Sequence, residues 1–118
     1  MRLTNSILYS NSPAAIHIVG NVYNLKYSDF HSNGTNVTGN VPAGFGQLSG
    51  INANGDSCDA WYNIFLDPLL ADTGSGDYHL TWTNWPTPDS TKSPCIDAGD
   101  PSEPFDPDGT RPDIGAFY

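Results

Sequence analysis

The stretch Ser6-Ile7-Leu8-Tyr9-Ser10-Asn11 returns 22 positions later as Ser28-Asp29-Phe30-His31-Ser32-Asn33, so both copies follow the pattern Ser-x-x-x-Ser-Asn. A repeat of roughly 20 to 30 residues with short strands and Asn-ended turns is typical of a β-solenoid. In such a fold each coil lies parallel on the one before it, and the stacked coils align their Asn and Ser side chains into ladders. The repeat therefore predicts stacked coils, with a Greek-key sandwich as the structural alternative.

The rest of the chain favours strands over helices. Stretches of twelve residues with apolar positions at helical spacing are all interrupted by Gly or Pro, whereas short alternating or apolar segments are frequent. Besides the two copies of the repeat, the segments expected to form strands are 15–19, 22–27, 62–66 and 78–82. The prediction is an all-β chain.

The composition divides this single domain, residues 1–118, into four segments. Residues 1–34 carry the predicted coils, and residues 35–60, with five glycines and Pro42, predict a loop or insertion between coils. Residues 61–93 are expected to form the terminal coil or coils and a further loop. Residues 94–118 are rich in Pro and Asp, which prevents continuous strand pairing, so we expect an irregular tail that caps the last coil.

Charge excludes several classes of partner. The chain of 118 residues has 4 Lys and Arg against 13 Asp and Glu, a formal net charge of −9. Such a surface repels phosphate backbones and anionic membranes, so nucleic acid is not expected as a partner. Apolar runs stay far below the ~20 residues that a membrane span requires, which argues against membrane insertion. An acidic, turn-rich, Lys-poor composition indicates an extracellular or cell-surface protein, whose signal would lie outside this chain.

Four segments of the last third resemble a known family: 67–70 (DPLL), 76–80 (GDYHL), 93–101 (SPCIDAGDP) and 106–117 (DPDGTRPDIGAF). They are similar to the C-terminal part of secreted bacterial right-handed parallel β-helix proteins, the pectate-lyase-like proteins of the choice-of-anchor Q type. This resemblance implies a short right-handed parallel β-helix with a Pro- and Asp-rich C-terminal cap. Members of that family are typically longer. A stack of so few coils leaves an open strand edge, and we therefore expect self-association there.

Five carboxylates in the tail are candidate metal ligands. Asp106-Pro107-Asp108-Gly109 resembles the beginning of a calcium loop, with alternate carboxylates and a glycine for a sharp turn. The alternative is that the carboxylates cap turns by accepting bonds from backbone N–H groups, with Arg111 paired to one of them. The candidate calcium ligands are Asp97, Asp100, Asp106, Asp108 and Asp113.

Catalysis has weaker support. Pairs of carboxylates hydrolyse glycosides, and outside the tail the candidate carboxylates are Asp29, Asp67 and Asp77. A polyuronate, the substrate of lyases with a similar fold, would be repelled by the net charge of −9. The histidines show neither metal-ligand spacing nor a triad arrangement. The sequence thus favours a noncatalytic protein.

Two residue pairs remain. Trp82 and Trp85 flank the 83–93 loop and are candidates for an exposed platform that binds polysaccharide, although aromatic residues also serve as core in a chain poor in Leu and Val. Cys58 and Cys95 are candidates for one disulfide, the alternative being two separate buried thiols.

These observations predict a noncatalytic extracellular module, structural or adhesive, which self-associates and can be stabilised by calcium. The alternatives are a fragment of a carbohydrate-active enzyme, which the resemblance implies, and a carbohydrate-binding module that uses Trp82 and Trp85. The fold by itself does not distinguish between them, because it supports several functions.

Overall fold

The protein is all-β, as predicted. The computed structural model describes residues 2–21 and 24–117, and within them it holds ten short strands and a single 3-10 helix, η1. The strands form five two-stranded sheets, of which three are parallel and two antiparallel. In chain order the elements are β1 (Arg2–Thr4), β2 (Ile7–Tyr9), β3 (Ala14–Ile18), β4 (Asn24–Lys26), β5 (Asp29–His31), β6 (Thr35–Gly39), β7 (Gly50–Ile51), β8 (Ser57–Cys58), β9 (Leu70–Asp72), η1 (Thr73–Ser75) and β10 (Asp77–Leu80).

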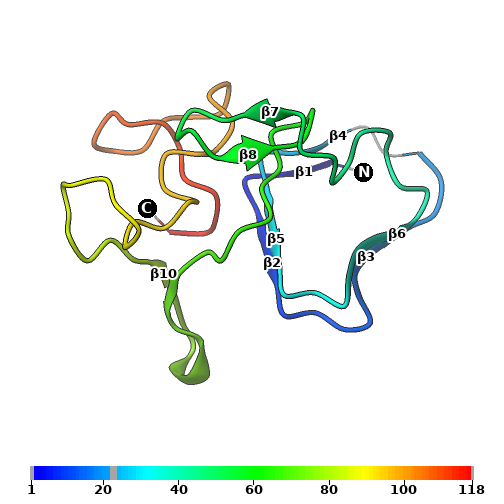
Figure 1. The fold of residues 1–118 in the computed structure, drawn as a ribbon, viewed down its shortest axis with the longest axis horizontal. Coiled ribbons are helices and arrows are strands. Elements are labelled where there is room, and N and C mark those ends of the chain that lie inside the picture. The colour runs from blue at the N-terminus through cyan, green and yellow to red at the C-terminus, as the bar shows by residue number, and fades with distance from the viewer. Residues whose placement is uncertain (1, 22–23, 118) are drawn as a thin grey trace.

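The two copies of the repeat lie on each other in register. β1 pairs with β4 and β2 with β5, which brings Leu8 opposite Phe30, and both pairs keep the spacing of 22 residues. β3 pairs with β6 at a spacing of 21, with Ile16 opposite Val37. All three pairs are parallel, and Figure 1 shows β2 beside β5 and β3 beside β6. We call residues 2–18 the first layer and residues 24–39 the second layer.

A third layer, residues 61–66, begins on the far side of the second. Ile64 forms a parallel bridge with Asp29, and the N–H of Tyr27 donates to the carbonyl of Trp61 over 3.1 Å. The corner before each layer's central strand has the same backbone conformation, with φ of 51° at Asn5, 47° at Tyr27 and 61° at Tyr62. The rings of Tyr27 and Tyr62 stack with centroids 5.0 Å apart, so the corner repeats in its side chains as well.

Polar side chains join the first two layers at the turns. Asn33 Oδ1 accepts from the backbone N–H and from the side-chain amide of Asn11, over 2.9 and 3.0 Å. The amide of Asn33 donates to the carbonyl of Leu8 over 2.9 Å. Ser28 Oγ accepts from the N–H of Ser6 over 3.3 Å. The ladder of Asn and Ser side chains that the repeat predicts is thus present.

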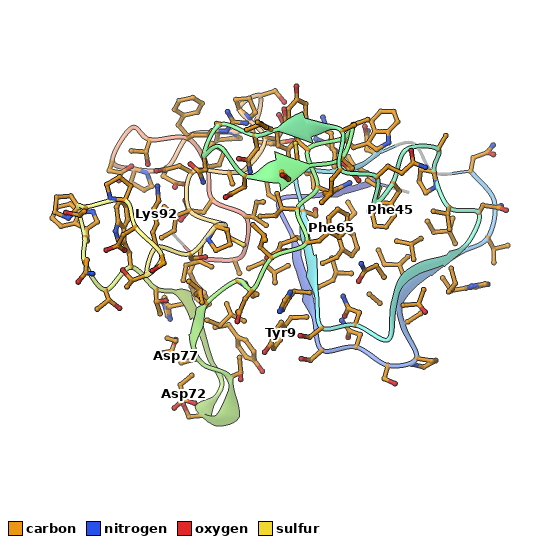
Figure 2. All side chains as sticks on the ribbon, in the orientation of Figure 1. Tyr9, Phe45, Phe65, Asp72, Asp77 and Lys92 are labelled. Carbon is orange, nitrogen blue, oxygen red and sulfur yellow. The ribbon has the colours of Figure 1, made fainter. Side chains whose placement is uncertain are left out.

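The apolar interior falls into two clusters. One lies between the layers around Phe30, which packs edge to face on Phe45 and in parallel with Phe65. Figure 2 shows Phe45 and Phe65 pointing into this space. The other cluster joins the layers to the tail and contains Ile64, Cys95 and Ile114, all with no exposed surface. The second cluster therefore attaches the tail to the strands by burial of apolar surface.

The disulfide between Cys58 and Cys95 is not formed. Both residues are free, fully buried thiols in the second apolar cluster, which corresponds to the alternative of two separate thiols. Cys95 instead donates its S–H to Asp29 Oδ2 over 3.2 Å. Cys58 lies in β8, opposite Gly50 of β7, in the 35–60 segment.

The predicted loop at 35–60 begins too early. Thr35–Gly39 is β6, and its pairing with β3 completes the second layer. A regular strand is also absent from 62–66, where only the bridge at Ile64 is formed, whereas 78–82 contains most of β10. The first two residues of the strand expected at 22–27 lie outside the described residues, and the rest contains β4.

The tail lies beside the layers at one corner instead of covering the last one. The N–H of Gly115 donates to the carbonyl of Asn5, and Asn5 Oδ1 accepts from the N–H of Asp100 over 2.7 Å. The ammonium of Lys26 lies 2.8 Å from the buried carboxylate of Asp100. Figure 1 shows this C-terminal part of the chain to one side of β1 and β2. The corner at Asn5 and Lys26 therefore holds the tail in place.

The Asn ladder is expected to contribute to stability. Replacing Asn33 by alanine removes its three hydrogen bonds to Asn11 and Leu8, and should lower the free energy of unfolding by about 1 to 2 kcal/mol, because the site is partly exposed. Chemical denaturation of Asn33→Ala checks this. The control is Asn21→Ala, an exposed asparagine outside the ladder. Equal midpoints for the two variants would contradict the assignment.

The buried carboxyl of Asp29 predicts a pH-dependent stability. Burial raises the pKa of Asp29 to about 7, against the N–H and S–H groups of Leu66 and Cys95 that lower it. The carboxyl has a higher pKa in the folded protein than its value of 3.8 in the unfolded chain. Its contribution to stability is therefore fully present below pH 3.8 and is lost as the pH rises from there to about 7.

Asp29→Asn carries no such charge and should therefore be more stable than the parent at pH 8, by about 2 to 4 kcal/mol, with a smaller difference at pH 4. Urea denaturation at both pH values measures this. Asp72→Asn changes the net charge equally on the exposed hairpin and should show no such pH dependence. If the difference in unfolding free energy between the parent and Asp29→Asn is the same at both pH values, the assignment is refuted.

Candidate functional site

The first layer has an open strand edge. Towards the second layer, the carbonyl of Ser6 accepts from the N–H of Asp29, and the N–H of Ser10 donates to the carbonyl of His31. Because backbone groups alternate in direction along a parallel strand, those of Ile7 and Tyr9 face the opposite way. Within the described residues β1, β2 and β3 have a strand partner on one side only. We call their other side the open edge.

A groove of about 680 Å³ runs along the middle of the open edge. Its floor is β2, and its walls come from the hairpin of β9 and β10, through Leu70 and Tyr78, and from the tail at Gly115 and Ala116. Figure 2 shows Tyr9 on the side of β2 that faces the hairpin. The groove is thus shaped by three separate segments, and nothing in the periodicity of the sequence indicates it.

A second hollow, of about 620 Å³, gathers most of the residues that the sequence singles out. Four of the five candidate metal ligands and both candidate tryptophans line it, together with two rings that sequence reasoning missed. Its aromatic and acidic lining consists of His79, Trp82, Trp85, Phe117, Asp97, Asp106, Asp108 and Asp113. We call it the tail hollow.

The carboxylates of the tail hollow repel one another. The pKa of Asp113 is raised to about 6, mainly by burial and also by the charges of Asp106, Asp97 and Asp108, while the bond from the N–H of Asp97 lowers it. The pKa of Asp106 is also raised, first by burial and then by Asp108 and Asp97. This pattern marks the hollow as a strongly negative place that favours hydrogen-bond donors or cations.

Asp100 lies elsewhere. It accepts from the N–H and hydroxyl of Ser102, and its carboxylate faces Lys26. Burial pushes its pKa up, but the bonds from Lys26 and Ser102 outweigh this and lower the pKa to about 2. Asp108 and Asp113 accept from Thr110 and from the N–H of Asp97. These are the turn-capping bonds of the alternative interpretation. Across residues 2–21 and 24–117, no three His, Cys, Asp or Glu side chains converge as metal ligands would.

Arg111 does not pair with an aspartate in the way the sequence suggested. Its Nε donates to the carbonyl of Gly99 over 2.7 Å, and its guanidinium lies 5.6 Å from the centre of the Tyr27 ring. The residue thus links the tail to the corner column of Tyr27 and Tyr62.

Trp82 and Trp85 do not form a flat platform. Their rings meet edge to face, at 75° and 6.5 Å between centroids. Trp82 donates its indole N–H to the carbonyl of Thr87, and Lys92 lies 4.5 Å over its ring. Trp85 is 71% exposed. Only Trp85 is therefore free to contact a large partner, at the margin of the tail hollow.

None of the candidate catalytic carboxylates lines the groove or the tail hollow. Asp29 is fully buried, Asp67 caps a turn at the N–H of Leu69, and Asp77 bonds to His79 over 2.7 Å in the exposed hairpin. Burial, followed by the charge of Asp29, raises the pKa of the Cys95 thiol, which keeps it protonated and unreactive. Cys95 and Asp29 do place a thiol beside a carboxylate, but both side chains are fully buried.

No protein-family model matches the sequence, and the comparisons with the curated proteins and with the solved structures found no match. Of the described residues, none belongs to a helix long and apolar enough to span a membrane.

Proposed function

We propose that the chain is a noncatalytic extracellular module, structural or adhesive, built as a short right-handed parallel β-helix that associates with a second copy through its open edge. The observation that carries the proposal is the in-register parallel stacking of two layers, of which the first, within the described residues, has a strand partner on one side only. The resemblance of the tail segments supports the same architecture and an extracellular place.

An unpaired parallel edge is a template for a further strand. Its backbone groups at Ile7 and Tyr9 are available for pairing, and the side chains of Leu3, Leu8 and Ile16 are only half-buried. Stacks of repeats gain stability from each added neighbour, because every layer covers the apolar interior of the next. Association at this end would therefore complete the burial that two layers leave unfinished.

Charge is distributed in a way that permits this association. The net charge is −9, yet residues 1–28 contain no Asp or Glu. The open edge therefore belongs to the part of the chain without acidic side chains, while the tail hollow concentrates them. Long-range repulsion between two acidic molecules remains, and salt screens it.

We expect the protein to form dimers or larger assemblies at tens of micromolar, more strongly at about 0.5 M than at about 0.05 M salt, by sedimentation velocity. Tyr9→Pro removes the N–H that faces the open edge and should give monomers, since proline is tolerated at a free strand edge. Tyr9→Ala is its matched control, because it also loses the ring but keeps the N–H. A monomeric parent at high concentration, or equal behaviour of the two variants, would overturn the proposal.

A second candidate function, saccharide binding, is favoured by the tail hollow. Trp85 offers an exposed ring in the lining that also contains Asp97 and Asp106, and carboxylates accept bonds from hydroxyl groups. Such a site would take a neutral polysaccharide and repel a polyuronate. Calcium, the cofactor suggested by the sequence, would bind to the same carboxylates.

If the hollow binds saccharide, Trp85→Ala should weaken retardation of the protein in gels that contain a neutral glucan by tenfold or more, because it loses a stacking ring. Trp61→Ala, which removes a 46% exposed ring outside the hollow, is the control. Isothermal titration with Ca²⁺, before and after chelation, tests the metal separately. Absence of retardation for the parent in neutral glucans would end the saccharide assignment.

A further inference from the structure

The contacts that the second and third layers make with the layer before them show how one layer recognises the next. Ser28 Oγ donates to the carbonyl of Lys26 over 3.0 Å and accepts from the N–H of Ser6 in the layer above. In the same way, Asn63 of the third layer accepts from the N–H of Ser28 over 3.1 Å. Each layer thus offers a side-chain oxygen to the corner N–H of the layer on top of it.

The first layer repeats the acceptor geometry on its open edge. Ser6 Oγ donates to the carbonyl of Thr4 over 3.0 Å, as Ser28 Oγ does to that of Lys26. The following turns match as well, with φ of 57° at Ser10 and 56° at Ser32. Ser6 Oγ therefore stands where Ser28 Oγ stands one layer below, with its acceptor lone pairs directed towards a layer not yet present.

The turn residue shows the same correspondence. Asn33 Oδ1 takes both the N–H and the side-chain amide of Asn11. Asn11 occupies the equivalent position of the first layer, and its amide nitrogen is used by Asn33, which leaves its Oδ1 for a donor from above. Ser6 and Asn11 both line the groove of the open edge, at either end of β2.

We infer that the open edge is a recognition site for a parallel strand of another polypeptide that carries the Ser-x-x-x-Ser-Asn spacing. The first serine would donate its N–H to Ser6 Oγ, and the asparagine would donate its N–H and amide to Asn11 Oδ1. Between them, the backbone of Ile7 and Tyr9 would pair with the incoming strand. The groove, about 680 Å³ and bounded by Tyr78 and Ala116, offers room for one such strand.

This inference rests on the β-helix part of the proposed function. It adds which sequence the open edge recognises and in which direction the bound strand runs. The chain itself supplies the natural probe, because residues 2–18 are the segment that already lies on a layer with a serine and an asparagine. That segment also lacks acidic residues, so it is not repelled by a protein with a net charge of −9.

The experiment is fluorescence anisotropy with a labelled peptide of sequence 2–18 and the full chain, dilute enough for the protein to be monomeric. We expect saturable binding, weakened about tenfold or more when the peptide's first motif serine is replaced by proline and its motif asparagine by alanine. On the protein, Ser6→Ala and Asn11→Ala should each weaken binding about threefold to tenfold. Ser12→Ala, an exposed serine of the same layer, should leave it unchanged.

Orientation gives a readout independent of affinity. A spin label on the N-terminus of the peptide should broaden the amide signals of residues 2–5 of the chain, and one on the C-terminus those of residues 14–18. The opposite pattern, or equal affinity for the substituted peptide, would overturn the inference. If the parent stays monomeric yet binds the peptide, only the proposed self-association is refuted. If the parent assembles but does not bind the peptide, only this inference is refuted.

Discussion

The structure depends on one constraint: a layer of this chain satisfies its backbone and corner groups only when another layer lies in register beside it. The spacing of 22 residues brings Ser6 above Ser28 and Asn11 above Asn33, and each contact is a hydrogen bond that neither segment makes alone. The left-handed residues at the corners, Asn5 and Tyr27, repeat at the same spacing. Turn conformation, strand register and side-chain ladder therefore specify one another, and a slip of one residue would lose all three.

The same constraint explains how the chain tolerates an insertion between the second and third layers. Asp59, which is buried, accepts from the N–H groups of Trp61 and Asn63 and from the amide of Asn63, and so fixes the corner at which the third layer begins. Asn63 in turn reaches Ser28 and the carbonyl of Leu25. With the return point held this firmly, β7 and β8 can form outside the stack, while Phe45 of the same segment packs into its interior. A loop of this length costs little more in closure entropy than a short one.

The sequence predicted the parts of the fold that local repetition determines. The Ser-x-x-x-Ser-Asn repeat indicated the register, and the tail aspartates Asp100 and Asp108 cap turns as one of the two interpretations held. β6 was missed because its residues, Thr35–Gly39, alternate only weakly and end in glycine, which resembles a loop. The tail hollow and the groove were beyond prediction. The groove arises where β2, the hairpin and the tail meet, and the hollow where the hairpin, the 83–93 loop and the tail meet, and no periodicity encodes these meetings.

Charge divides the molecule into an acidic tail and a first layer without acidic side chains. Carboxylates of the tail can crowd together because they lie away from the layers, and where Asp100 does reach them it meets Lys26. Asp29, which belongs to the second layer itself, has its pKa raised to about 7 by burial. The first layer, free of acids, keeps its edge neutral and suited to strand pairing. An acidic first layer would repel the second copy that we propose to bind there. The uneven distribution thus lets one small chain remain highly charged and still keep one strand edge free of acidic side chains.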